Sequence, residues 1–323
     1  MKKRYFALGL VVLMLATLLA ACGGGDTSSS TPPASTPDSS TSTPDSSAPP
    51  ATDAVYDAAY NYFATFPSDN NVIKAADLFT MMDNEDEMFI LDIRRPDDYA
   101  AGHLIGAVNL SFFDMSIAEN LDKLPDDRPI MVYCYTGQTA SQVTALLNIA
   151  GKVAKNVQSG FNNAISKEEN YETYIETTEN ALPGDTYAVD AAISTAISGY
   201  FSEKMAKDGT AFANFNIAPE SVKEIVDNMD DSYVILSVRR ADDYAAGHIP
   251  GAINIPYGQG MEAELANLPT DKTIIVYCYS GQTSSQTTAV LRMMGYDAYS
   301  MSGGMGSPDG GGWLGAGYET VTD

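Results

Sequence analysis

The chain has 323 residues, a formal net charge of −24 at pH 7, and a hydrophobic fraction of 45%. An acidic protein of this kind repels the phosphates of nucleic acids and the anionic headgroups of lipids, so the folded part is not expected to bind either. About 270 residues follow an N-terminal segment of unusual composition, which is enough for two domains that each bury a core.

Residues 1–21 are predicted to be a signal peptide. Lys2, Lys3 and Arg4 form a basic start, an apolar run follows, and small residues precede Cys22. This ending is similar to the lipobox of bacterial lipoproteins, in which the cysteine is lipidated and becomes the mature N-terminus. A transmembrane anchor is the alternative, because the apolar run approaches the length that spans a bilayer. We expect an extracytoplasmic protein that is anchored to a bacterial membrane only by lipid at Cys22.

Residues 22–52 are predicted to form a disordered tether. From residue 26 to residue 51 the chain is nearly all Ser, Thr, Pro, Asp and Ala, which leaves almost nothing to bury. At ~3.3 Å per residue, this stretch reaches at most about 80 Å. It would hold the folded part away from the membrane. Removal of the signal peptide with its three basic residues would change the formal net charge of the protein from −24 to −27.

The rest of the chain contains one unit of sequence twice. Residues 94–110 align with residues 239–255, and the two segments are identical at 12 of 17 positions. Residues 129–147 align with residues 273–291, with identity at 13 of 19 positions. Because the repeat period is about 145 residues, it indicates duplicated domains rather than a solenoid of short repeats.

Each unit alternates short apolar runs with helical patterns, which favours an α/β fold of two tandem domains, each a mostly parallel sheet flanked by helices. The predicted domains are residues 53–180 and 186–323, each beginning with a helical prefix, at residues 53–66 and 189–205. The predicted strands are residues 88–91, 108–110, 130–133, 233–236, 253–255 and 273–276, and the other predicted helices are residues 75–82, 141–149, 219–229 and 285–294.

The most informative motif is a cysteine loop found in both units. Cys134 closes an apolar run, and a polar loop with a glycine leads from it into a helical pattern; Cys278 has the same position in the second unit. Backbone N–H groups and the positive end of the helix dipole favour an anionic sulfur at such a junction. The predicted substrate-binding residues are Tyr135, Thr136, Gly137, Gln138 and Thr139 in the first loop and Tyr279, Ser280, Gly281, Gln282 and Thr283 in the second.

Other uses of these cysteines fit the sequence less well. A disulfide between Cys134 and Cys278 would require equivalent loops of two repeats to face each other. A cysteine phosphatase needs an arginine six residues after the cysteine to hold phosphate, and neither loop has one. A cysteine protease needs a histidine beside the thiol. The only histidines, His103 and His248, lie in Gly-His-x-x-Gly-Ala motifs, where we expect them to bond backbone groups.

These motifs, in fixed order and present twice, resemble the rhodanese family in a tandem arrangement. The resemblance covers about residues 68–165 and 212–316. It implies that each thiolate, of Cys134 and of Cys278, takes a sulfane sulfur from a small donor and becomes a persulfide. The sulfur then passes to a thiol or cyanide-like acceptor. No metal or organic cofactor is implied, since the persulfide is itself the covalent intermediate, and no protein partner can be named.

The residues expected to support the two sites structurally are Asp92, Arg94, His103, Arg239 and His248. We expect Arg94 and Arg239 to pair with carboxylates of the Asp-Asp segment that follows each of them. The second unit departs from the pattern because Ser237 replaces the acidic residue of the first unit.

Both cysteine loops lack the Arg or Lys that family members active on thiosulfate often place beside the cysteine. We therefore expect weak use of thiosulfate and a preference for a neutral persulfide, polysulfide or protein donor. The alternative to an enzyme is a rhodanese-fold module at the cell surface that binds a partner or senses redox state without turnover.

Overall fold

The computed structural model describes residues 53–322, in which the two sequence repeats contact each other. The predicted signal peptide, the lipidation site Cys22 and the tether lie outside the described residues. Within the described part of the chain, no helix is long and apolar enough to cross a bilayer.

The first repeat is built on a five-stranded sheet with the order β1-β6-β5-β2-β4, in which all neighbours are parallel. The central strands β2 and β5 are buried along their whole length, as expected for a parallel sheet with both faces covered. The strands are β1 (Val72–Ile73), β2 (Phe89–Asp92), β4 (Val108–Asn109), β5 (Ile130–Tyr133) and β6 (Ala154–Val157), and the helices are α2 (Ala75–Asp83), α3 (Pro96–Ala101), α4 (Ser116–Glu119), α5 (Gln138–Ile149) and α6 (Gly160–Asn163).

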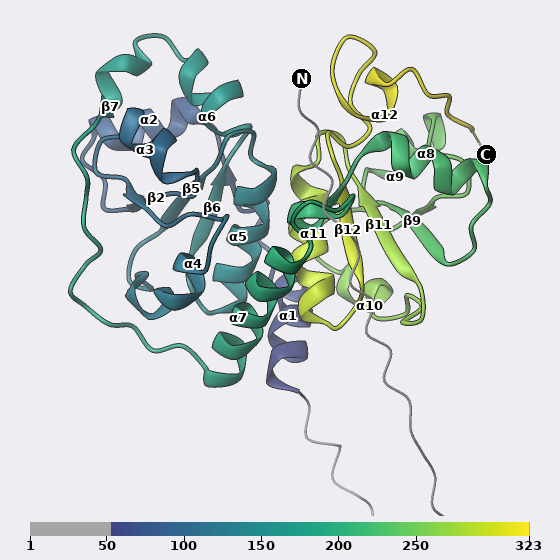
Figure 1. The fold of residues 1–323 in the computed structure, drawn as a ribbon, viewed down its shortest axis with the longest axis horizontal. Coiled ribbons are helices and arrows are strands. Elements are labelled where there is room, and N and C mark those ends of the chain that lie inside the picture. Colours follow the sequence, from purple (N-terminus) through teal and green to yellow (C-terminus); the bar gives the residue numbers. More distant parts are fainter. Residues whose placement is uncertain (1–52, 323) are drawn as a thin grey trace, which may run out of the picture. The chain divides into compact units, whose positions relative to one another are not determined.

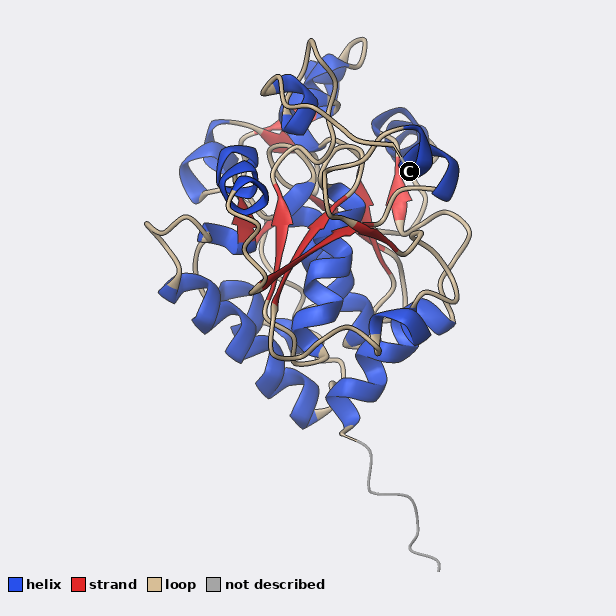
Figure 2. Cartoon of the chain, turned by 90° about the vertical axis from the view of Figure 1, so that its right-hand side faces the viewer, coloured by secondary structure: helices blue, strands red, loops and turns tan. Residues whose placement is uncertain are grey.

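The second repeat has an equivalent parallel sheet with the order β10-β9-β11-β12-β8. Figure 2 shows helices on both sides of the central strands. The strands are β8 (Asn216–Ile217), β9 (Tyr233–Ser237), β10 (Ile253–Asn254), β11 (Thr273–Tyr277) and β12 (Ala298–Met301), and the helices are α8 (Pro219–Asp227), α9 (Ala241–Ala246), α10 (Glu262–Leu265), α11 (Gln282–Met293) and α12 (Gly312–Gly315).

The predicted α/β class with two mostly parallel sheets is confirmed. The structure adds the strands β1, β6, β8 and β12, which the apolar pattern did not indicate, and it begins α5 and α11 three residues earlier than predicted. A further small sheet pairs β3 (His103–Leu104) antiparallel with β7 (Ile175–Glu176). Short 3-10 helices complete the chain: η1 (Leu121–Lys123), η2 (Ile165–Lys167), η3 (Tyr171–Tyr174) and η4 (Ala213–Phe215).

The two helical prefixes, α1 (Ala54–Ala64) and α7 (Ala191–Ala206), lie between the repeats and contact elements of both (Figure 1). Helix α1 contacts α10 and α11 of the second repeat, and α7 contacts α4 of the first. The Tyr62 hydroxyl on α1 donates to Gln286 of α11 at 2.5 Å, and Tyr200 on α7 donates to Gln142 of α5 at 2.7 Å. Helices α5 and α11 also pack together, so one continuous core contains residues of both repeats.

Candidate active site

The two cysteine loops lie at the carboxyl ends of central parallel strands. Cys134 follows β5 and Cys278 follows β11, and α5 and α11 begin four residues after them. Gly137 and Gly281 are the N-caps of these helices, with φ values of +89° and +88°. Only glycine adopts this left-handed conformation without steric cost. The local sequence therefore curls the chain tightly between each cysteine and its helix.

Backbone amides of the loop point at each sulfur. The N–H of Gly137 donates to Cys134 Sγ at 3.1 Å, and the N–H of Ala140 does so at 3.4 Å. In the second repeat, Gly281 N donates to Cys278 Sγ at 3.1 Å, and the hydroxyl of Ser284 replaces the second amide at 3.4 Å. Donors fixed around a sulfur stabilise negative charge that develops on it.

Both thiols are free, and each is only 2% exposed. The disulfide alternative is therefore excluded in this structure.

A second segment packs beneath each loop. Phe161 N donates to the carbonyl of Cys134 at 2.7 Å, and Met305 N donates to the carbonyl of Cys278 at 2.7 Å. A Cβ atom on Gly160 would lie 2.6 Å from the Cys134 carbonyl oxygen, which is too close for any side chain. Sequence reasoning missed these bracing segments, although each contains a glycine shortly after the last strand, in chain order, of its parallel sheet.

Gln138 and Gln282, predicted to bind substrate, have side chains that reach across to the opposite repeat. Gln282 Oε1 accepts a hydrogen bond from Ser159 N of the first repeat at 2.9 Å. Gln138 Oε1 accepts from Gly303 N of the second repeat at 3.2 Å, and Gln138 Nε2 donates to the Gly281 carbonyl at 3.4 Å. These reciprocal glutamine contacts join each cysteine loop to the segment that packs beneath the other loop, which we call the brace of that loop.

Several of the predicted loop residues line two cavities. A cavity of about 390 Å³ contains Cys278 in its wall and combines its loop with the first repeat. A cavity of about 490 Å³ lies between the two loops. Tyr279, Ser280 and Gln282 line both cavities, Thr283 lines the first, and Thr136 and Gln138 line the second.

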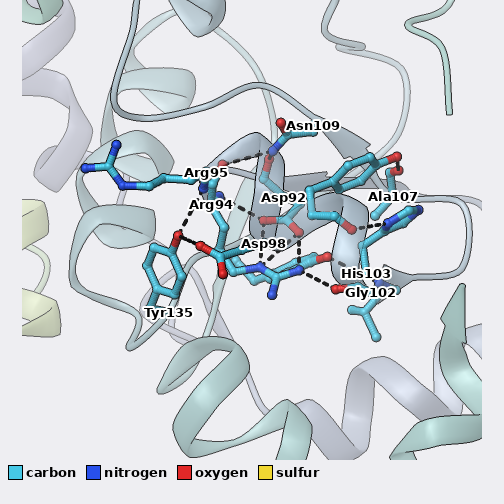
Figure 3. Close-up of polar contacts among 12 residues, drawn as sticks. Asp92, Arg94, Arg95, Asp98, Gly102, His103, Ala107, Asn109 and Tyr135 are labelled. Atoms are coloured by element: carbon cyan, nitrogen blue, oxygen red, sulfur yellow. Dashed lines mark hydrogen bonds and ion pairs between the residues drawn. The ribbon is translucent and has the colours of Figure 1, made fainter. Parts of the chain in front are cut away.

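Arg94 lies in a buried network beneath the first loop (Figure 3). Its Nη2 donates to Asp92 Oδ2 at 2.6 Å and to the Gly102 carbonyl at 2.8 Å. Burial alone would lower the pKa of Arg94, but hydrogen bonds and the charge of Asp92 outweigh it and raise the pKa. The expected pairing with the following Asp-Asp segment was wrong, because the nearer carboxylate lies two residues earlier at the strand end. Asp98 instead accepts from the hydroxyl of Tyr135 at 2.5 Å.

The equivalent network in the second repeat is incomplete. Arg239 Nη2 donates to the Gly247 carbonyl at 2.5 Å, and Ser237 Oγ only accepts from the Arg239 backbone at 3.4 Å. The Nε of Arg239 is buried without a hydrogen-bond partner among the described residues. The expected partner again was wrong, since Asp243 pairs with Arg240 at 2.8 Å.

Each histidine contacts a backbone carbonyl of the short helix before its motif, and His103 contacts a second carbonyl outside that helix. His103 Nδ1 lies 2.8 Å from the carbonyl oxygen of Tyr99, and its Nε2 lies 3.0 Å from that of Thr178. His248 Nδ1 lies 3.0 Å from the carbonyl oxygen of Tyr244. Each ring also stacks on the tyrosine whose carbonyl it contacts. Across residues 53–322, no group of three or more His, Cys, Asp or Glu side chains could hold a metal ion.

A family model described as "Rhodanese-like domain" matches residues 74–167 and 220–307, more than half of the chain. A tRNA sulfurtransferase of Desulfurococcus amylolyticus is 31% identical over 32% of this chain and 21% of its own length. The thiosulfate sulfurtransferase GlpE of Pseudomonas entomophila is 33% identical over 30% of this chain and 75% of its own. The solved structure of the 3-mercaptopyruvate sulfotransferase SseA from Escherichia coli is 18% identical, with a TM-score of 0.34, over 72% of this chain and 98% of its own. The chain thus spans less than a quarter of the tRNA sulfurtransferase that it matches.

Proposed function

We propose that this chain, which belongs to the rhodanese-like domain family, is a sulfurtransferase that uses Cys134 and Cys278 as persulfide carriers. The observation that carries the proposal is the pair of free cysteines, each with a loop amide 3.1 Å from its sulfur. Relatives named as thiosulfate sulfurtransferases support the reaction class.

The chemistry would proceed in two displacements at the loop. The cysteine thiolate attacks the outer sulfur of the donor, the donor's S–S bond breaks, and the remaining fragment leaves with the electron pair. A nucleophilic acceptor then attacks the outer sulfur of the cysteine persulfide, and the cysteine leaves as the thiolate. The amides of Gly137 and Gly281 would stabilise the anionic sulfur both as nucleophile and as leaving group.

Steady-state turnover tests this proposal. The full chain, its Cys134→Ala and Cys278→Ala variants and the double variant are assayed with inorganic polysulfide or thiosulfate as the donor and cyanide as the acceptor, with thiocyanate as the product measured. We expect each single variant to keep the activity of its remaining site and the double variant to lose turnover. Wild-type turnover by the double variant would overturn the proposal, and persulfide formation without turnover would favour a binding or sensing module.

The location of the protein is a separate proposal that rests on the sequence alone. We propose that Cys22 carries a lipid that holds the two domains outside the cytoplasm. Cys22→Ser should release the mature protein from the membrane fraction, and mass spectrometry of the wild-type N-terminal peptide should show acyl chains. An unmodified Cys22 in a membrane-bound protein would contradict this proposal.

A further inference from the structure

The cavity at Cys278 is built from both repeats. The second repeat supplies Cys278 and the loop that follows it, and the first repeat supplies Asp69, Lys74 and Asp77. The volume of about 390 Å³ is sufficient for a small metabolite. The cysteine of one repeat therefore shares a cavity with charged side chains of the other repeat.

Of the three charged side chains in this cavity, one cation and one carboxylate are available to bind a ligand. Asp69 is paired with Lys155, whose Nζ lies 2.6 Å from Asp69 Oδ2. Lys74 is the N-cap residue of α2 and Asp77 lies in its first turn, and both side chains are exposed. Neither Lys74 nor Asp77 forms an ion pair or side-chain hydrogen bond with another described residue.

The second repeat has neither charge at the equivalent positions, although Glu220 lies in the first turn of its helix. Helix α8 occupies the position of α2, since each follows the edge strand that pairs with the last strand of its sheet. The N-cap of α8 is Ala218, and its first-turn position equivalent to Asp77 is Ser221. The cation and carboxylate therefore distinguish the Cys278 cavity from the equivalent surroundings of Cys134.

We propose that the Cys278 cavity is an acceptor site for small zwitterionic aminothiols, in which Lys74 holds the carboxylate and Asp77 the ammonium group. A ligand that carries both charges satisfies both side chains, whereas Asp77 repels a simple anion and Lys74 repels a simple cation. The inference rests on the proposed function, because it requires a persulfide on Cys278.

The transfer step is a thiol–persulfide displacement. The acceptor thiolate attacks the outer sulfur of the Cys278 persulfide and forms a new S–S bond with it. The bond between that sulfur and Cys278 Sγ breaks, and Cys278 leaves with the electron pair. The acceptor departs as a persulfide, so no external oxidant or reductant is consumed.

The experiment measures single-turnover transfer in the Cys134→Ala background. The protein is loaded with inorganic polysulfide, freed of excess donor, and mixed with one of four acceptors: L-cysteine, 3-mercaptopropionate, cysteamine or 2-mercaptoethanol. Loss of the persulfide is followed by intact mass. Each rate for Lys74→Gln or Asp77→Asn is divided by the parent rate for the same acceptor, which cancels differences in intrinsic thiol reactivity.

We expect Lys74→Gln to slow transfer to L-cysteine and 3-mercaptopropionate by about tenfold, and Asp77→Asn to slow transfer to L-cysteine and cysteamine similarly. For both variants, the rate of transfer to 2-mercaptoethanol should stay within about twofold of the parent rate. Lys167→Gln, an exposed change of equal charge outside the cavity, should leave all four rates unchanged. In the Cys278→Ala background, Lys74→Gln should not change the rate of sulfur transfer from the Cys134 persulfide to any of the four acceptors.

Two results would overturn the inference in distinguishable ways. If the persulfide forms on Cys278 but the variants change all four acceptors equally, or none, the charged pair does not select the acceptor. If no persulfide forms on Cys278, the proposed function of that site fails as well.

Discussion

Ser237 and Asp92 occupy equivalent strand ends beside a buried arginine, yet only Asp92 carries a charge. Ser237→Asp should stabilise the protein by about 2 kcal/mol, because it gives the unpaired Nε of Arg239 a charged partner. Asp92→Ser should destabilise it by roughly 3 kcal/mol, since it leaves Arg94 buried without its carboxylate. Urea unfolding with an unchanged slope measures both effects. A lower urea midpoint for Ser237→Asp would show that Arg239 does not need an acidic partner.

At the scale of elements, the reciprocal glutamine contacts link each helix start to the brace of the other loop. Gln282→Ala removes the acceptor of both Ser159 N and Asn156 Nδ2, and it should slow persulfide formation at Cys134 by about fivefold, because the loss of Ser159's acceptor loosens the segment beneath that loop. It is measured by intact mass in the Cys278→Ala background. Gln138→Ala, tested in the Cys134→Ala background, is the matched variant for Cys278. An unchanged rate at Cys134 in Gln282→Ala, and at Cys278 in Gln138→Ala, would contradict this coupling.

The antiparallel pair of β3 and β7 should contribute less to the stability of the fold in acid. Asn180 and the N–H of Gly106 donate to Glu176 and lower the pKa of its carboxyl group. A lowered pKa in the folded state adds stability above the unfolded value, about 4.3 for Glu, and this stability is lost as pH falls through the folded pKa. Between about pH 5 and pH 3, the urea midpoint of wild type should therefore fall more than that of Glu176→Gln. Parallel curves would show that Glu176 contributes no pH-dependent stability.

At the scale of the whole molecule, one core cluster contains residues from both repeats, and each prefix helix contacts elements of both repeats. We therefore expect a single cooperative unfolding transition rather than one for each domain. In urea, Cys134 and Cys278 should become accessible to alkylation at the same midpoint, measured separately in the Cys278→Ala and Cys134→Ala variants. Two separate midpoints would mean that the repeats unfold independently.

The sequence predicts the fold class well because the central strands are continuous apolar runs of clear period. It misses β6, where Lys155 and Asn156 interrupt the apolar pattern, and the two-residue strands β1 and β8, which are too short to show one. The cysteine loop is predictable because strand, glycine and helix follow one another locally.

Contacts between the repeats are not predictable in the same way. No local pattern shows that Gln282 bonds Ser159, or that Lys74 shares a cavity with Cys278, because these residues are far apart in the sequence. Weak use of thiosulfate is expected because neither cysteine loop contains a basic side chain, and it remains a prediction. That expectation is based on each repeat alone, so it leaves out Lys74, which the first repeat contributes to the Cys278 cavity.

Each cysteine loop should hold a sulfur that can accept another sulfur atom. Intact mass is measured after incubation with a sulfane donor, on the wild type and on Cys134→Ala and Cys278→Ala. We expect one added sulfur atom for each cysteine retained in the folded part, and a thiol reductant should remove it. No added mass on either single variant, with both proteins folded and both thiols free, would contradict this expectation.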